Sequence, residues 1–136
     1  MKIMLDKGAI APVRAHELDA GYDLFAIDGC IVPAKEYAIF DTGVHIELPP
    51  GTVGFLKSKS GLNVKHSLVG EGVIDAGYTG SIKVKLYNHG GMDYHIYPGD
   101  KISQLVILPI LTPDLEVVES LDDTERGSSG FGSTGR

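Results

Sequence analysis

The sequence of 136 residues has one cysteine, no tryptophan and no long apolar segment. A single cysteine, Cys30, cannot form a disulfide within the chain, so we expect the fold to depend on its hydrophobic core. The longest apolar run, residues 105–108, is far too short to cross a bilayer. The N-terminus also lacks the apolar stretch of a signal peptide. We therefore expect a cytoplasmic protein with no membrane partner.

Basic residues are also scarce, because 12 Lys and Arg face 18 Asp and Glu, for a formal net charge of −6. General nucleic-acid binders normally have a basic excess, so we expect no nucleic-acid partner. The charge is uneven along the chain: residues 57–101 contain more lysine than acid, whereas residues 114–125 contain acids and no base. This distribution leaves room for a small anionic ligand near the middle of the chain, with a solvated acidic linker after it.

Glycine and proline are abundant, with 18 Gly and 7 Pro, and they indicate many tight turns. Val44–Leu48 and Ile82–Leu86 place an apolar residue at every second position, which predicts strands with one buried face. Weaker strand signals lie at Ile3–Leu5, Tyr22–Ala26, Tyr37–Phe40, Val53–Leu56, Tyr94–Ile96, Lys101–Leu108 and Leu115–Val118. One short helix is expected at Ser60–His66, with Ser60 as its N-cap. The pattern predicts one all-β domain: a sandwich, jelly roll or barrel.

The C-terminal segment Arg126–Gly135 combines glycines and hydroxyl residues around the aromatic Phe131. Its last six residues match G-x-G-x-x-G, but no strand precedes them and no helix follows, so a dinucleotide-binding motif is excluded. Composition alone favours a flexible linker. The functional alternative is an anion-binding arm in which glycine amides and Arg126 contact phosphate and Phe131 stacks on a base.

Three inner segments are further candidates for chemistry. Lys57–Leu62 places two cations and two hydroxyls at the start of the predicted helix, either as a phosphate site or as a solvated turn. Gly72–Gly80 places Asp75 and Tyr78 at what we expect to be a hairpin tip, where Asp75 either caps its own turn or acts as a general base. Asp23, in Ala20–Leu24, is most simply an edge-strand acid. The histidines lack zinc-site spacing, so no structural metal is expected.

Taken in order, these segments resemble the motifs of the trimeric dUTP diphosphatase (dUTPase) family. The matching blocks extend over nearly the whole chain: Ala20–Leu24, Ser58–Leu62, Gly72–Gly80, Gly99–Leu105 and Arg126–Gly135. Each block alone is a weak or moderate signal, whereas five blocks in this order are specific. The resemblance implies an all-β distorted barrel or jelly roll over residues 1–120. It also implies a C-terminal arm, residues 121–136, that closes over a neighbouring active site within a homotrimer.

The resemblance further implies an activity. Such enzymes hydrolyse dUTP to dUMP and pyrophosphate with Mg²⁺, which limits uracil in DNA and supplies dUMP for thymidylate synthesis. Asp75 would deprotonate the water that attacks the α-phosphorus, Tyr78 would lie under the deoxyribose, and Asp23 would orient Mg²⁺ through bound water. The other residues implied in substrate binding are Lys59, Ser60, Gly61, Gly72, Ile74, Lys85, Gln104, Arg126, Gly130, Phe131, Gly132, Ser133 and Thr134.

Within that set the implied roles differ. Ser60, Gly61 and Gln104 would contact phosphates, and the backbone of residues 72–78 would pair with the uracil edge. The arm would close over the β- and γ-phosphates through Arg126, Ser133 and Thr134, while Phe131 stacks on uracil. Lys59 and Lys101 stand where the family usually has arginine, and the two cations differ in geometry and hydration.

Two alternatives remain at this point. A related dCTP deaminase would need a catalytic glutamate after the expected hairpin, where the sequence instead has Ile82–Leu86. A nucleotide-sensing regulatory protein, like some phage-borne relatives, would have a protein partner in addition to dUTP.

Overall fold

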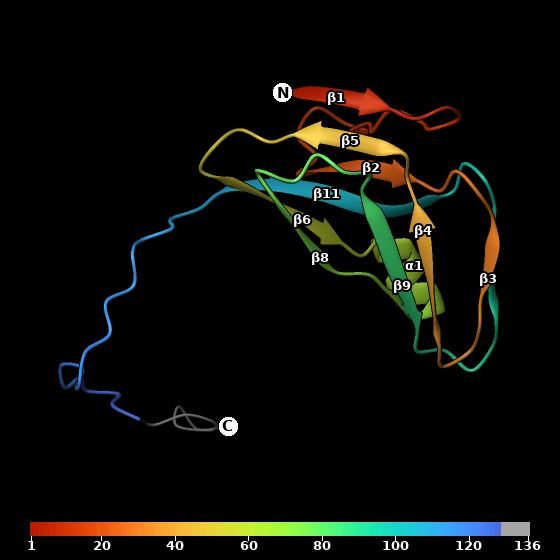
Figure 1. The fold of residues 1–136 in the computed structure, drawn as a ribbon. Helices are drawn as coiled ribbons and strands as arrows, with labels where there is room; N and C mark the ends of the chain where they lie inside the picture. The colour runs from red at the N-terminus through yellow and green to blue at the C-terminus, as the bar shows by residue number, and fades with distance from the viewer. Residues whose placement is uncertain (129–136) are drawn as a thin grey trace.

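The computed structural model describes residues 1–128, which are mostly β-strands with one short helix (Figure 1). A four-stranded sheet has the order β2, β11, β6, β8, formed by Gly21–Phe25, Lys101–Pro109, Thr52–Lys57 and Gly72–Asp75. A three-stranded sheet has the order β4, β9, β7, formed by Tyr37–Asp41, Lys83–Asn88 and Leu68–Val69. Two antiparallel pairs complete the structure: β1 (Lys2–Leu5) with β5 (Val44–Glu47), and β3 (Cys30–Val32) with β10 (Tyr94–Ile96).

The larger sheets pack against each other through one hydrophobic core. Leu24 and Leu105 from the four-stranded sheet join Val84 and Leu86 from the three-stranded sheet in the same buried cluster. Neighbouring strands such as β2 and β11 are distant in the sequence, so the chain crosses repeatedly between sheets. This arrangement is a jelly roll, and within residues 1–128 the strands do not close into a barrel.

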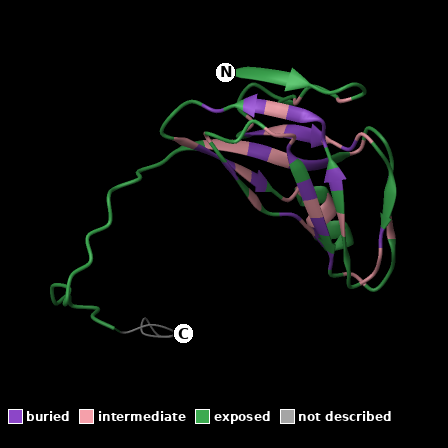
Figure 2. Cartoon of the chain, in the orientation of Figure 1, coloured by how far each residue is buried: buried purple, intermediate pink, exposed green. Residues whose placement is uncertain are grey.

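The alternating segments behave as predicted. In β9, Val84 and Leu86 are buried while Lys83 and Tyr87 are exposed, and β5 alternates in the same way. Apolar residues therefore line the core side of both strands (Figure 2). Across residues 1–128, no helix is long and apolar enough to cross a membrane.

The helix α1 covers Ser60–His66, as predicted, but the expected cap is wrong. Ser60 already lies inside the helix, and Lys59 occupies the N-cap position with an extended backbone and no side-chain capping bond. The first turn is closed by the backbone instead, since the Asn63 amide donates to the Lys59 carbonyl at 2.9 Å. The helix ends at His66, and the C-cap residue Ser67 has a left-handed φ of 56°.

Leu115–Val118 is not a strand. Leu115 and Val117 are 95% and 99% exposed, and the segment after β11 extends away from the body of the molecule (Figures 1 and 2). Its alternation of apolar residues predicts a strand, but a strand needs a neighbour to pair with, and within residues 1–128 it has none. Conversely, the sequence pattern does not predict β3, β7 and β8, because they are short or contain turn-forming residues.

Candidate active site

A buried carboxylate holds two lysines at the edge of the four-stranded sheet. Asp23 is 6% exposed; its Oδ1 accepts a hydrogen bond from Lys59 Nζ, and its Oδ2 lies 2.8 Å from Lys101 Nζ. Burial raises the pKa of Asp23, but the hydrogen bonds from Lys101 and Lys59 outweigh it, so the pKa lies below its ordinary value. With Asp23 ionised, one carboxylate and two ammonium groups together carry a net positive charge, which suits an anionic ligand.

Strand register places Gln104 beside this group. Gln104 in β11 pairs with Asp23 on one side and with Lys57 on the other, and its Nε2 donates to the Ser58 carbonyl at 3.3 Å. We call Asp23, Lys59, Lys101 and Gln104 the Asp23 cluster. Three segments singled out from the sequence therefore come together, and Lys101 has a direct role in the cluster.

Gly61 lies next to the cluster in sequence, at the start of α1. A Cβ at this position would meet no atom within 4 Å, so packing within the chain does not require glycine there. Ser60 and Gly61 are both exposed. This opening leaves the backbone accessible to a ligand.

A second region lies around Asp75, at the end of β8. A cavity of about 220 Å³ is lined by Val73, Ile74, Asp75, Tyr78 and Lys83. Asp75 is exposed, whereas Ile74 also packs into the core. We call this hollow the Asp75 cavity. It unites three predicted site residues with Lys83, which the sequence analysis does not place in the site.

The segment that carries Tyr78 is not the expected hairpin tip. β8 and β9 belong to different sheets and do not pair, so residues 76–82, the Tyr78 loop, cross between sheets. The Tyr78 amide donates to the Asp75 carbonyl at 2.9 Å, and the phenol donates to the Ser81 carbonyl at 2.9 Å. A Cβ at Gly80 would lie 2.5 Å from the phenol oxygen. A side chain at position 80 would therefore displace the Tyr78 ring from its place over the loop.

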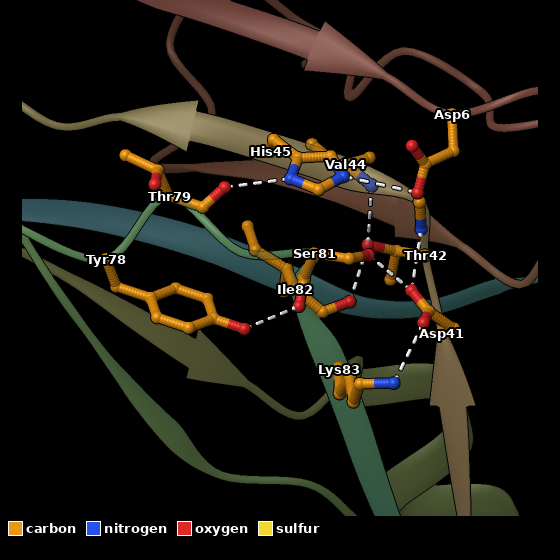
Figure 3. A network of polar contacts seen from close by, with 11 residues as sticks. Asp6, Asp41, Thr42, Val44, His45, Tyr78, Thr79, Ser81, Ile82 and Lys83 are labelled. Atoms are coloured by element: carbon orange, nitrogen blue, oxygen red, sulfur yellow. Dashed lines mark hydrogen bonds and ion pairs between the residues drawn. The ribbon is translucent and has the colours of Figure 1, made fainter.

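The Tyr78 loop is anchored to the turn between β4 and β5 (Figure 3). Asp41 Oδ1 accepts hydrogen bonds from the Ser81 hydroxyl and, at 3.0 Å, from the Gly43 amide, and Lys83 Nζ lies 2.9 Å from Oδ2. The Ser81 hydrogen bond is the largest influence on the pKa of Asp41; with the Gly43 and Lys83 contacts it outweighs burial and lowers this pKa to about 2.

This lowered pKa predicts acid-sensitive stability. An acid with a depressed folded-state pKa stabilises the fold above its unfolded value, here 3.8, and that contribution is lost as pH falls through about 2. Because the side chain is 45% exposed, solvent screening limits the effect to about 1 kcal/mol. Asp41→Asn should lower the free energy of unfolding by this amount at pH 7, and the difference should shrink below pH 4. Urea unfolding at several pH values measures it.

Glu47→Gln is the matched control, because its ion pair with Lys2 is highly exposed, at 61% and 84%. We expect little change in stability from that substitution. A wild-type to Asp41→Asn difference that stays constant from pH 7 to pH 2 would contradict the role given to the Asp41 carboxylate.

The Asp23 cluster and the Asp75 cavity lie far apart within one chain. Their strands, β2 and β8, are opposite edges of the four-stranded sheet, about 14 Å apart at the usual strand spacing. Asp75 pairs with Val53 and Gln104 with Lys57, four residues away in β6, which adds about 13 Å along the strands. A single chain therefore does not bring the two regions to one ligand.

The remaining predicted site residues lie elsewhere. Lys85 projects from β9 between two rings, with Nζ 3.8 Å from the Tyr37 centroid and 4.6 Å from the Tyr87 centroid, and does not line the Asp75 cavity. Gly72 lies in β8 opposite Leu56. Arg126 is exposed in the C-terminal segment. The predicted residues Gly130, Phe131, Gly132, Ser133 and Thr134 lie outside the described residues.

The jelly roll has a cationic cluster on one edge of its four-stranded sheet and a carboxylate-bearing cavity on the other edge, an arrangement that defines a binding protein for an anionic ligand. The dUTPase family model matches residues 7–135. The deoxyuridine 5′-triphosphate nucleotidohydrolase of Clostridium acetobutylicum is 44% identical over 134 residues, covering 96% of this chain and 92% of that protein. That of Mus musculus is 46% identical over 135 residues, covering 98% and 83%. The chain belongs to the dUTPase family.

Solved structures agree with this assignment. The dUTPase of Staphylococcus bacteriophage 80alpha, with dUpNHpp, has a TM-score of 0.93 at 35% identity, covering 99% of this chain and 98% of that one. A mutant of the dUTPase from phage phi11 of S. aureus has a TM-score of 0.83 at 33% identity, covering 90% and 98%, and is described with a structural Mg(II) ion.

Proposed function

We propose that this chain hydrolyses dUTP to dUMP and pyrophosphate. The observation that carries the proposal is the Asp75 cavity, which an exposed carboxylate and Tyr78 both line in a chain of the dUTPase family. Relatives named deoxyuridine 5′-triphosphate nucleotidohydrolase match almost the whole chain, and a solved neighbour contains dUpNHpp.

In this proposal Asp75 is the general base. Its carboxylate accepts a proton from the water that attacks the α-phosphorus, and it is held at the end of a paired strand, which fixes its position. Tyr78 packs under the deoxyribose, where a ribose 2′-hydroxyl would collide with the ring. Selectivity for deoxyribose then comes from steric exclusion. The backbone of residues 72–78 pairs with the uracil edge.

The Asp23 cluster binds the phosphates. Lys59 and Lys101 supply positive charge, Asp23 orients both ammonium groups, and Gln104, Ser60 and Gly61 add polar contacts. Because phosphoryl transfer depends mainly on positioning and charge stabilisation, a rigid cationic surface is the contribution this part of the chain makes.

The cluster also suits Mg²⁺. Residues 1–128 contain no group of three or more His, Cys, Asp or Glu side chains that could hold a metal ion alone. Mg²⁺ at a nucleotide site needs no such cage, since it keeps several waters and is held by one or two carboxylates with the phosphates. A carboxylate has about four acceptor positions, so Asp23 can still accept hydrogen bonds from metal-bound water beside Lys59 and Lys101. When bound, Mg²⁺ neutralises charge on the triphosphate.

We further propose that the active site is shared between copies in a homotrimer. The separation of Asp75 from Asp23 supports this, because a single chain leaves the base far from the phosphate cluster. The exposed segment Leu115–Val118 supports it too, since its alternating pattern fits a strand that pairs with another copy. The arm, residues 121–136, would then bring Arg126, Ser133 and Thr134 over the β- and γ-phosphates, with Phe131 on uracil.

Pyrophosphate release from dUTP, dCTP, dTTP and UTP with Mg²⁺ tests the activity. We expect rapid release from dUTP and little from the other three nucleotides, because the Asp75 cavity selects both base and sugar. No release from dUTP, or equal rates on all four, would overturn the proposal. Ammonia release from dCTP would instead indicate a deaminase, for which β9 offers Lys83 and Lys85 but no glutamate.

An added regulatory role is the second candidate. Phage dUTPases, among them that of Staphylococcus bacteriophage 80alpha, are described as controlling the transfer of virulence genes. Pull-downs with and without a dUTP analogue would separate the two roles. Capture of a specific partner by the nucleotide-loaded form alone would support nucleotide sensing, and capture of none would count against it.

A further inference from the structure

His45, in β5, contacts the Tyr78 loop at Thr79. In β5 its neighbours Val44 and Ile46 are buried, so the imidazole points away from the core, and its side chain is only 18% exposed. Its Nδ1 lies 2.8 Å from the Thr79 carbonyl oxygen, and its Nε2 lies 3.2 Å from Asp6 Oδ2 (Figure 3). Both partner atoms are acceptors, so the ring makes both hydrogen bonds at once only in the protonated form, in which both nitrogens donate.

The charges around the ring favour this protonated form. Asp6 faces it from the segment after β1, and Asp41 faces it from β4. Lys83 of β9 is paired with Asp41, and Glu47 of β5 is paired with Lys2 of β1. The hydrogen bond to the Thr79 carbonyl, followed by the one to Asp6, raises the pKa of His45 above its ordinary value.

The contact lies where the Tyr78 loop needs it. Tyr78 and Thr79 stand between Gly77 and Gly80, and glycine leaves the backbone on either side permissive. The Asp41 contacts hold the loop at Ser81 and beyond. The His45 contact holds it at Thr79, directly after Tyr78, so it limits how far the ring can move within the Asp75 cavity.

We infer that His45 is a positioning residue, and that its protonated ring, bridging Asp6 and the Thr79 carbonyl, sets how strongly Tyr78 excludes a ribose. This inference rests on the proposed function. As pH rises through the pKa of His45, the ring keeps one N–H, so it can no longer donate to both Thr79 and Asp6. The loop then loosens and discrimination against UTP weakens.

The test compares kcat/KM for dUTP and for UTP between pH 6 and pH 9. For the wild-type chain we expect the dUTP-to-UTP ratio to fall roughly fivefold as His45 deprotonates, the effect of one weakened hydrogen bond. His45→Asn keeps an N–H near the Nδ1 position without titrating but cannot also reach Asp6, so its ratio should be independent of pH and should match that of the wild type at high pH. His45→Leu lacks both donors, so its ratio should be low at every pH.

His16→Asn is the matched control, because His16 makes a similar contact with Asp19, at 3.2 Å, in an exposed loop. Its pH profile should match that of the wild type. NMR titration of the His45 ring and the Gly80 amide, without nucleotide, gives an independent readout, and the two signals should shift together. Wild-type hydrolysis of dUTP with a constant dUTP-to-UTP ratio while His45 titrates would overturn this inference alone. Absence of dUTP hydrolysis would overturn the proposed function.

Discussion

Asp75→Asn is expected to lower kcat for dUTP by roughly 10²- to 10⁴-fold, the usual range for loss of a positioned general base, with little change in KM. The amide has nearly the same shape as the carboxylate, so the Asp75 cavity should still receive the nucleotide. The amide, however, cannot accept a proton from the attacking water. An interaction lost only in the transition state lowers kcat and kcat/KM equally. Steady-state pyrophosphate release with Mg²⁺ measures both constants.

Asp28→Asn provides the control, because Asp28 is a turn acid between β2 and β3, outside both regions of the site. Its kinetic constants should equal those of the wild type. Since Asp75 is itself exposed, thermal stability should also be unchanged in Asp75→Asn. A large increase in KM with kcat intact would show that Asp75 binds the nucleotide and does not act as the base.

Removal of residues 126–136 is expected to reduce kcat/KM for dUTP by about 10²-fold or more, the loss that follows from misplacing a bound substrate. The arm would close over the phosphates and exclude water, and Arg126 would contribute a forked cation. Folding should be nearly unaffected, because residues 110–128 are all exposed and contribute nothing to the buried core. We expect Tm to change by less than about 3 °C.

Removal of Arg136 alone is the control, since it leaves residues 126–135 in place. That variant should retain near wild-type kcat/KM. If removal of residues 126–136 lowered Tm as severely as it lowered activity, the arm would be part of the stable fold and not a closing element.

The strands that the sequence predicts most clearly are those whose periodicity is long enough to identify a buried face. β5 and β9 alternate over several residues, and each places its apolar side chains in the core. β7 has only two residues, too few for a period to appear. Leu115–Val118 fails for another reason: periodicity indicates the ability to form a strand, while pairing depends on a neighbour that one chain does not supply.

The candidate site shows a similar division. The charge of its segment indicates Lys59, whereas Asp23 and Gln104 are indicated only by the resemblance to the dUTPase family. The three residues do lie together. The contact of His45 with Asp6 spans 39 residues, and no local pattern indicates it. The distance between Asp75 and Asp23 is likewise hidden, because it depends on strand order and register, which a single sequence does not specify.

The placement of Asp75 and Asp23 on opposite edges of one sheet has a genetic consequence under the proposed assembly. An allele that alters Asp75 damages only the site to which its chain contributes the base, while an allele that alters Lys59 damages a different site. Two inactive alleles expressed together would therefore form mixed assemblies in which some sites are assembled entirely from unaltered parts. Such a pair would restore part of the activity, although neither altered chain forms an intact site with copies of itself.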